Sequence, residues 1–353
     1  MLPIVPNEVF DSAESGESSE LGRFELCQDQ QFGFYFNSEY QSVDYVSDRY
    51  QNEQAHSPIF VRHLQVVAQE IATRFGLSSS VVEVGCGKGA FFRVLSSLGF
   101  KSLRGFDKTY EGDDPRITQG YLTPSDGPLN ADVLVLRHVL EHVQRPIEFL
   151  RDLTKINGKS CSFVIEVPST DWIIKNSTFW DFTYEHVNYF TSESFQKIFG
   201  VCEITETFDS QYLLLFGESE SLVRRLIDES SESSLFSEIL VKARRNSIFD
   251  YSLKHLGRYW IWGVATKGVL ITYHLVMLDS NLARYPEGIV DINPAKQNKF
   301  CAGSGIQIFS PESFLSLLRD GDKVFVVNPM YEVEVTKFIE ASSSKKVTIE
   351  VMN

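Results

Sequence analysis

Paired cysteines are missing from this sequence. The chain has five cysteines in 353 residues, an odd number, and no two of them stand in a Cys-x-x-Cys spacing. A disulfide framework and a cysteine-based metal site both need such pairs, so the sequence indicates neither. The pattern is typical of a reducing compartment, and we expect no metal.

An excess of basic residues is also missing. There are 33 Lys and Arg residues against 47 Asp and Glu residues, which gives a formal net charge of −14. This balance argues against binding to a phosphate backbone or to an anionic membrane surface. We therefore expect a small-molecule substrate, and neither nucleic acid nor a membrane as a partner.

No apolar run is long enough for a membrane helix. The longest, Gly268–Leu278, has about half of the necessary length and contains Tyr273 and His274. The first residues, Met1–Phe10, carry no basic region of the kind that opens a signal peptide. We expect a cytoplasmic location.

The apolar content is nevertheless sufficient for more than one domain, because 43% of the residues are hydrophobic. We expect an N-terminal segment over residues 1–75, with a hairpin and a lead-in helix, a ligand-binding α/β domain over 76–217 and a second α/β domain over 218–353. Residues 1–20 are expected to be mobile, because the acidic, serine-rich stretch Asp11–Glu20 can bury little apolar surface.

A glycine-rich turn follows a predicted buried strand. Val81–Val84 is a short β-branched run, and Gly85, Gly87 and Gly89 then stand at every second position before a predicted helix, Ala90–Leu98. Glycine permits a tight turn and a close approach of a ligand, and the free N–H groups at the helix start offer donors. The pattern predicts a nucleotide-like ligand across the turn. The alternative is a plain glycine turn of an α/β domain.

The glycine spacing also carries a resemblance. Glu83 stands two residues before the first glycine, and Gly-x-Gly-x-Gly differs from the dinucleotide fingerprint. Together these features resemble motif I of the S-adenosylmethionine-dependent methyltransferases. The resemblance implies S-adenosyl-L-methionine (SAM) as cofactor, held at Glu83, Gly85, Cys86, Gly87 and Gly89, and makes 76–217 the methyltransferase domain.

Further cofactor contacts are expected where the following strands end. Asp107 ends the next predicted strand, at about the place where such folds put a carboxylate for the ribose hydroxyls. The alternative is a helix cap or a turn former. Tyr121 lies at the end of a short strand. Arg137 and His138 follow the buried strand Ala131–Leu136, in a block that resembles the post-strand motif that faces the methionine part of the cofactor.

The pattern beyond this block completes a first α/β unit. The predicted buried strand Ser162–Pro168 is followed by an antiparallel closing pair, Val201–Thr207 and Tyr212–Gly217. The Glu- and Ser-rich stretch Glu218–Ser234 is the expected linker, and a helix-like segment, Leu235–His255, follows it.

A second strand-turn-helix, Tyr259–Gly268, opens a smaller parallel sheet. Its other predicted strands are Ile289–Ile292, Lys323–Val327 and Lys346–Val351, and its predicted helices are Pro311–Leu318 and Tyr331–Ala341. The turn has only two spaced glycines, so both a structural turn and a nucleotide site remain open. The predicted fold class is α/β, with a Rossmann-like class I methyltransferase domain followed by a second, smaller Rossmann-like domain.

Three stretches together resemble the sugar C-methyltransferases, which methylate a carbon of a nucleotide-linked deoxysugar. They are the glycine turn, the segment Asp181–Thr191 with its Glu-His-x-x-Tyr-Phe block, and C-terminal motifs at residues 262–268, 291–297 and 310–312. Two departures stand out. The family opens with a cysteine-rich zinc module, whereas Cys27 lacks a partner cysteine, so four ligands cannot be assembled. The family's Tyr-His-Glu-His reads Thr-Tyr-Glu-His here.

The resemblance implies His186 as the catalytic base, because a carbon next to a ketone must lose a proton before it can attack the methyl group. Glu185 would orient His186 or bind a substrate hydroxyl. Tyr184, Asn188 or Tyr189 would donate a hydrogen bond to the enolate oxygen.

Structural alternatives exist for these residues. His186 stands in an aromatic-rich segment and could serve packing alone. Tyr50 is a candidate substrate contact, although regularly placed tyrosines such as Tyr40, Tyr45 and Tyr50 usually serve packing. His142 precedes a helix that starts at a proline, and we interpret it as structural.

The leading functional hypothesis is C-methylation next to a carbonyl of a nucleotide-linked sugar or a similar small metabolite. O- or N-methylation of a different metabolite is the first alternative. A SAM-binding scaffold without catalysis is the second, and it would require a damaged cofactor turn, which the intact Gly85, Gly87, Gly89 and Asp107 do not indicate.

Overall fold

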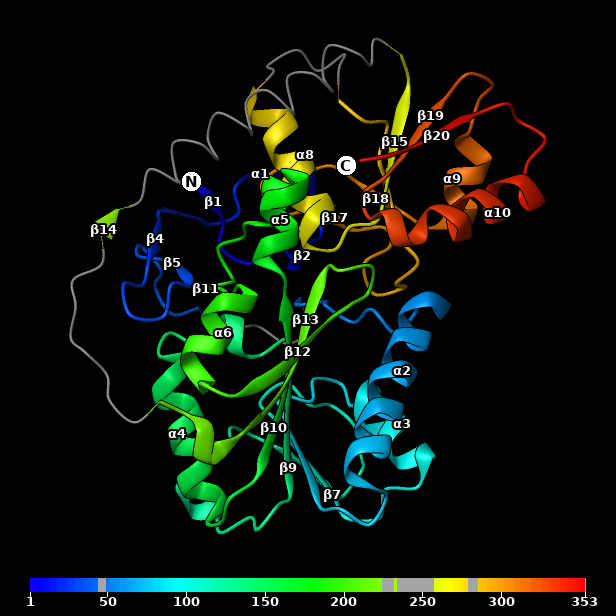
Figure 1. Cartoon of the computed structure of the whole chain (residues 1–353). Coiled ribbons are helices and arrows are strands. Elements are labelled where there is room, and N and C mark those ends of the chain that lie inside the picture. Colours follow the sequence, from blue (N-terminus) through cyan, green and yellow to red (C-terminus); the bar gives the residue numbers. More distant parts are fainter. Residues whose placement is uncertain (44–48, 224–231, 234–256, 279–284, 353) are drawn as a thin grey trace.

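The computed structural model describes residues 1–43, 49–223, 232–233, 257–278 and 285–352, with the backbone alone at 232–233. Three features of the sequence analysis lie outside these residues: Tyr45, the predicted helix-like segment at 235–255 and much of the expected linker. Two sheets, each covered by helices, make up most of the chain (Figure 1). The predicted domain boundaries at residues 75 and 217 stay predictions.

The first sheet has seven strands in the order β12-β13-β10-β9-β6-β7-β8. Five of them pair in parallel, and β12 and β13 close the sheet as the predicted antiparallel pair. The strands are β6 (Val81–Val84), β7 (Leu103–Asp107), β8 (Ile117–Gln119), β9 (Val133–Arg137), β10 (Ser162–Pro168), β12 (Cys202–Thr207) and β13 (Tyr212–Glu218). The β-branched and leucine-rich runs of β6, β9 and β10 are buried, as expected for central parallel strands.

Helices cover both faces of this sheet. They are α2 (Pro58–Phe75), α3 (Ala90–Leu98), α4 (Pro146–Asn157) and α6 (Ser192–Phe199), whereas Ile173 of α5 (Thr170–Asn176) belongs to the core of the second sheet. One core joins α2 and α3 to the sheet, and a second core joins α4 and α6 to its other face (Figure 1). The predicted lead-in helix is α2, where Ser57 accepts hydrogen bonds from the first-turn N–H groups and Gly76 caps the last turn.

The second sheet is entirely parallel, as predicted, with the order β18-β16-β15-β19-β20. Its strands are β15 (Tyr259–Trp262), β16 (Ile289–Val290), β18 (Ile308–Phe309), β19 (Lys323–Val326) and β20 (Thr348–Val351), and its helices are α8 (Thr266–Leu278), α9 (Pro311–Leu317) and α10 (Glu332–Ser342). Short 3-10 turns complete the described chain: η1 (Pro124–Asp126), η2 (Leu140–His142), η3 (Phe179–Asp181), η4 (Ser219–Ser221) and η6 (Pro329–Tyr331).

The predicted mobility of residues 1–20 is not what the structure shows. Strand β1 (Leu2–Pro3) pairs with β3 (Leu21–Gly22), and β2 (Val9–Phe10) pairs with β17 (Phe300–Cys301) in the second half of the chain. Between them, α1 (Ala13–Glu17) begins at a serine that caps its first turn. Leu2 and Val9 of this segment are buried, and backbone pairing with β3 and β17 satisfies further polar groups, which composition alone does not reveal.

The predicted hairpin is confirmed, and it extends into a small sheet of its own. Strands β4 (Leu26–Gln28) and β5 (Tyr35–Asn37) pair with each other. Strand β11 (Asn188–Tyr189) adds to β5, and β14 (Glu232–Ser233) adds to β4. The segment with the Glu-His-x-x-Tyr-Phe block is thereby fixed between the hairpin and the first sheet.

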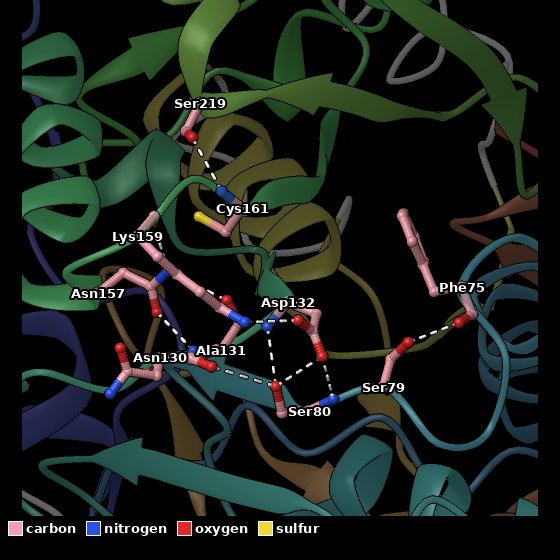
Figure 2. A network of polar contacts seen from close by, with 10 residues as sticks. All are labelled: Phe75, Ser79, Ser80, Asn130, Ala131, Asp132, Asn157, Lys159, Cys161 and Ser219. Atoms are coloured by element: carbon pink, nitrogen blue, oxygen red, sulfur yellow. Dashed lines mark hydrogen bonds and ion pairs between the residues drawn. The ribbon is translucent and has the colours of Figure 1, made fainter.

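A polar network closes the amino-terminal edge of the first sheet (Figure 2). One carboxylate oxygen of Asp132 accepts hydrogen bonds from the backbone N–H and the hydroxyl of Ser80, and the other pairs with Lys159. The side-chain amide of Asn157 accepts a hydrogen bond from the N–H of Ala131 and donates one to its carbonyl oxygen. These bonds from Lys159 and Ser80 lower the pKa of Asp132 to about 2. The strand starts are thus held together, while the carboxyl ends remain for a ligand.

Among the residues that the structure describes, every helix is too short or too polar to cross a lipid bilayer.

Candidate active site

A cavity of about 600 Å³ lies at the carboxyl-terminal ends of the strands, with walls from both α/β units and from the N-terminal segment. Its size is within the range of small-molecule sites. It is lined by the glycine turn, by the residues after β9, by Glu185 and His186, and by the turn that follows β15. Residues far apart in the sequence therefore share one ligand site.

The glycine turn has the geometry of a ligand cradle. The backbone of Gly85 is in the left-handed region, with φ +76°, and a Cβ there would overlap the side chain of Val139. Gly87 is also left-handed, with φ +54°, but a Cβ there would meet nothing within 4 Å. Both line the cavity. Gly89 caps α3 and does not line it, so its predicted cofactor contact is not supported.

Asp107 stands at the end of β7 and lines the cavity, next to the glycine turn. One carboxylate oxygen accepts a hydrogen bond of 2.7 Å from the N–H of Gly87, and the other accepts bonds from the N–H and hydroxyl of Thr109. Asp107 therefore fixes the shape of the turn. Its oxygens have further lone pairs that ribose hydroxyls can reach.

Glu83 is a buried carboxyl that lacks a full set of partners. It is 3% exposed, it lines the cavity, and its Oε2 has no hydrogen-bond donor among the described residues. Burial raises the pKa of Glu83 to about 7, with Arg137 acting in the opposite direction. A buried carboxylate oxygen without a donor fits a cationic ligand group, such as the α-ammonium group of SAM.

Two other predicted cofactor residues contribute less through their side chains. Cys86 lines the cavity, but its thiol lies against β7, close to Gly105, and burial raises the pKa of this thiol. Tyr121 is 70% exposed and stands at the edge of the cavity, with Lys108 facing its ring. We conclude that Cys86 offers its backbone and Tyr121 an exposed aromatic surface.

Arg137 and His138 both line the cavity, and a buried carboxylate supports them. Glu166, on β10, accepts a hydrogen bond of 2.7 Å from Arg137, and Nε2 of His63 lies 2.8 Å from its Oε1. Burial alone would raise the pKa of Glu166, but Arg137 and His63 bring it well below its usual range. His138 has φ +53°, uncommon outside glycine, and its N–H donates to the backbone oxygen of Glu166.

His186 faces the cavity beside a second histidine. Its ring lies edge-on to that of His142, with the centroids 4.9 Å apart. Polar atoms of Glu141, His142 and His186 lie within 4.8 Å of one another, a grouping that can share a proton or hold a metal ion. Burial and the neighbouring His142 lower the pKa of His186 to about 3, so its ring is neutral at pH 7 and can accept a proton.

Glu185 is 1% exposed and also lines the cavity. Its Oε2 accepts a hydrogen bond of 3.2 Å from the hydroxyl of Tyr50, which lines the same cavity, and its Oε1 has no donor among the described residues. Burial raises the pKa of Glu185 to about 7. The predicted role of orienting His186 is not supported, because the described contacts of this carboxylate are to other residues. A substrate hydroxyl remains a suitable donor for Oε1.

Three predicted catalytic or substrate residues are corrected, because they do not line the cavity and bind the backbone instead. The hydroxyl of Tyr184 accepts a hydrogen bond from the N–H of Gln41. The amide of Asn188 donates to two carbonyl groups around η2, and the hydroxyl of Tyr189 bonds both backbone groups of Thr183. These side chains shape the segment that carries Glu185 and His186.

Other lining residues were not predicted from the sequence. His142, interpreted as structural, lines the cavity, and its Nδ1 lies 2.9 Å from the backbone oxygen of Glu185. Asn7 from the N-terminal segment and Lys296 from the second unit line it as well. The position of His142 after a ligand-edge strand was an available signal. Nothing in the local sequence marks Asn7, because only the tertiary fold brings it to the site, whereas Lys296 lies in the motif at residues 291–297 but had no role assigned to it.

A comparison with known protein families identifies one domain. Residues 60–200 match the family model of a methyltransferase domain. No curated protein sequence matches the chain significantly. Magnesium protoporphyrin IX methyltransferase from Synechocystis PCC 6803 has a similar structure, with 14% identity, a TM-score of 0.35, and coverage of 50% of this chain and 89% of that chain. The 1,6-didemethyltoxoflavin-N1-methyltransferase of Burkholderia thailandensis has 10% identity, a TM-score of 0.35, and coverage of 55% and 98%.

The family match and the open glycine turn lead to the same conclusion. Residues 60–200 carry a methyltransferase domain of the Rossmann-like class I fold, built on the seven-stranded sheet. The protein is a SAM-dependent methyltransferase.

Proposed function

We propose that this enzyme methylates a carbon next to a carbonyl group of a nucleotide-linked sugar or a similar small metabolite, with His186 as the base. The observation that carries the proposal is the shared cavity. A neutral imidazole, a carboxylate oxygen without a donor and the glycine turn all line it. Small-molecule sites combine such polar groups with apolar walls.

The cofactor fits the first α/β unit. Bound SAM supplies an electrophilic methyl group on a positively charged sulfur. Gly87 leaves room for it at the turn, Asp107 offers oxygens to the ribose, and Glu83 offers an unpaired carboxylate oxygen to the α-ammonium group. Arg137 and His138 border the same space.

The chain's own residues account for the removal of the proton. The carbon next to the carbonyl transfers its proton to the ring of His186, and the electron pair of the C–H bond moves to the carbonyl oxygen. Burial makes the free imidazole a weak base, but negative charge that develops beside it favours the protonated ring. The nearby carboxylate of Glu141 acts in the same direction. Glu185 holds a substrate hydroxyl through Oε1.

A second candidate is methylation of an oxygen or nitrogen atom of a small metabolite. A neutral histidine beside the cavity can also deprotonate a hydroxyl group, so the same arrangement serves this reaction. The two candidates differ in the atom that carries the methyl group.

We would test the proposal by incubating the enzyme with SAM labelled with ¹³C in its methyl group and a panel of keto-deoxysugar nucleotides, hydroxylated metabolites and amines. The carbon chemical shift of the product separates C-, O- and N-methyl groups. C-methylation of a keto sugar is the expected result. Methylation of an oxygen or nitrogen acceptor alone would replace the leading proposal by the second.

The role of the base has its own test. His186→Ala is expected to retain SAM affinity and to lose turnover by about a hundredfold or more, the usual contribution of a general base. Tyr184→Phe is the matched control, because this side chain is two residues away but does not line the cavity. Normal turnover in the His186 variant would place the base elsewhere.

A further inference from the structure

We propose that Glu141, His142 and His186 form a site for a divalent transition metal ion such as Zn²⁺, and that the bound ion stops methyl transfer. The metal site itself does not depend on the reaction. The inhibition rests on the proposed function, since it takes His186 to be the base. No metal is expected from the cysteine spacing, and this set uses imidazole and carboxylate ligands instead.

The three side chains meet at the cavity wall from two segments that are far apart in the sequence. Glu141 and His142 belong to η2, after β9, and His186 stands just before β11. One ligand atom from each residue lies within 4.8 Å of the other two. Because zinc–ligand distances are about 2 Å, the ligand atoms of a tetrahedral site stand about 3.3 Å apart. Small rotations of the side chains therefore close the set around an ion.

A hydrogen bond fixes which nitrogen of His142 can bind an ion. Its Nδ1 lies 2.9 Å from the backbone oxygen of Glu185. Because a carbonyl oxygen only accepts, Nδ1 carries the proton and Nε2 keeps the lone pair. Metal-binding histidines are commonly oriented in this way through their other ring nitrogen. The same bond ties η2 to the segment that carries His186, and the amide of Asn188 adds two bonds to carbonyl groups around η2.

Glu141 supplies a carboxylate oxygen that lacks a donor. The residue is 1% exposed and lines the cavity. Its Oε1 lies 3.3 Å from Nδ1 of His138, whereas its Oε2 has no hydrogen-bond donor among the described residues. A buried carboxylate oxygen without a partner is costly. A cation held between Glu141 and the two imidazole rings would remove this cost.

The chemistry of the three ligands selects the kind of ion. Two imidazole nitrogens and one carboxylate oxygen suit zinc, whereas Mg²⁺ and Ca²⁺ prefer oxygen ligands alone. Three protein ligands leave a further coordination position, which faces the cavity because all three residues line it. A neutral imidazole has a single ring lone pair. An ion bound to His186 uses that lone pair, so the ring can no longer accept a proton from the substrate carbon.

The test uses the full-length protein after treatment with a chelator. Competition with a chromophoric chelator measures Zn²⁺ affinity, and Co²⁺ serves as a spectroscopic probe of the ligands. We expect one tightly bound Zn²⁺ in the wild type. His142→Ala should lose affinity by about a hundredfold or more, because even the loss of an outer-shell partner can cost that much. His56→Ala is the matched control, since this exposed histidine lines the same cavity outside the group of three, and it should bind Zn²⁺ as the wild type does.

Two results would overturn the metal site: a wild-type protein that binds no Zn²⁺, or equal affinity in the wild type and a folded His142→Ala protein. Should that variant fail to fold, His186→Ala gives the same readout. These measurements need no acceptor, so they test the site independently of the proposed function.

The inhibition is tested with an acceptor from the methylation panel. Saturating Zn²⁺ should lower the turnover of the wild type by about a hundredfold, as much as the loss of a general base, and EDTA should restore it. If Zn²⁺ binds as expected but turnover is unchanged, the metal site stands, and both the inhibition and the role of His186 as base fall.

Discussion

The two α/β units of this chain use the same local design and reach different results. In each, a strand ends in a glycine-containing turn, and an aspartate from the neighbouring strand region accepts a hydrogen bond from an N–H of that turn: Asp107 from Gly87 at 2.7 Å and Asp291 from Val264 at 2.8 Å. The first turn leaves open space at Gly87. The second is closed, because a Cβ on Gly268 would overlap the carbonyl oxygen of Gly263.

The difference shows that a turn's shape, more than its hydrogen bonds, decides whether it can cradle a cofactor. A ligand needs open space beside the backbone of the turn. The first turn leaves such space at Gly87, whereas the second uses its close approach to pack α8 against the carbonyl group of Gly263. Both turns face the cavity, so the second can still contact an acceptor.

The largest change in free energy is expected when a side chain is added at the second turn, where it should lower the stability of the fold. Gly268→Ala forces a methyl group onto the backbone of Gly263, and we expect a loss of about 3 kcal/mol in the free energy of unfolding, as for overpacked cores. Urea denaturation measures this loss. Gly257→Ala in the same unit is the control, because a Cβ there meets no atom within 4 Å. Equal stability of the two variants would contradict the closed-turn description.

A substitution in the first turn should act on the cofactor instead. Gly87→Leu fills the open space and is expected to weaken SAM binding by more than about tenfold, which corresponds to about 1.4 kcal/mol. Gly99→Ala is the control, because Gly99 has a left-handed φ of +107° but does not line the cavity. Both variants carry backbone strain, and only the first should change the dissociation constant in calorimetry. A weakened affinity in both would assign the effect to strain.

The pH dependence of SAM binding should identify Glu83 as part of the open turn's site. Burial raises the pKa of Glu83 to about 7, and only its charged form attracts an α-ammonium group. SAM affinity should therefore fall as the pH decreases from 8 to 6, and Glu83→Gln should bind weakly with little pH dependence. For the free protein the sign is opposite: the raised pKa means that the stabilising contribution is present below the unfolded value and is lost as the pH rises through 7. A wild-type pH profile in the variant would exclude Glu83.

Much of the fold could be predicted from the sequence, because the strands of both sheets have recognisable local sequence patterns. Short β-branched runs, glycine turns and capped helices predicted the strands of both units to within a few residues, except β18, which was not predicted. The glycine turn, Asp107 and the pair Glu185 and His186 were likewise found from motifs, and all but Gly89 of the turn line the cavity. Local patterns fail where a side chain's direction depends on distant partners.

Tyr184 and Asn7 show this limit in opposite ways. Tyr184 lies next to Glu185 in a segment rich in polar and aromatic residues, yet its hydroxyl is bound by the backbone of residue 41. Asn7 stands in a stretch without any motif, yet its partner Lys296 is 289 positions away in the sequence. Such contacts form only when the two sheets and the N-terminal segment come together, so no spacing rule contains them.

The smallest change in SAM affinity is expected from substitutions of the two aspartates, Asp107 and Asp291. These substitutions also compare the two turns most directly. Asp107→Asn removes the charge that is expected to receive the ribose hydroxyls, and we expect SAM affinity to fall by about tenfold, the value of one charge-assisted hydrogen bond. Asp291→Asn makes the same change at the closed turn and should leave SAM affinity within about twofold, because the second turn is not expected to hold the cofactor. Calorimetry at one pH measures both, and thermal melting checks that each variant is folded. Equal losses would mean that the cofactor is shared between the turns, and an intact affinity in Asp107→Asn would mean that this carboxylate serves only to hold Gly87.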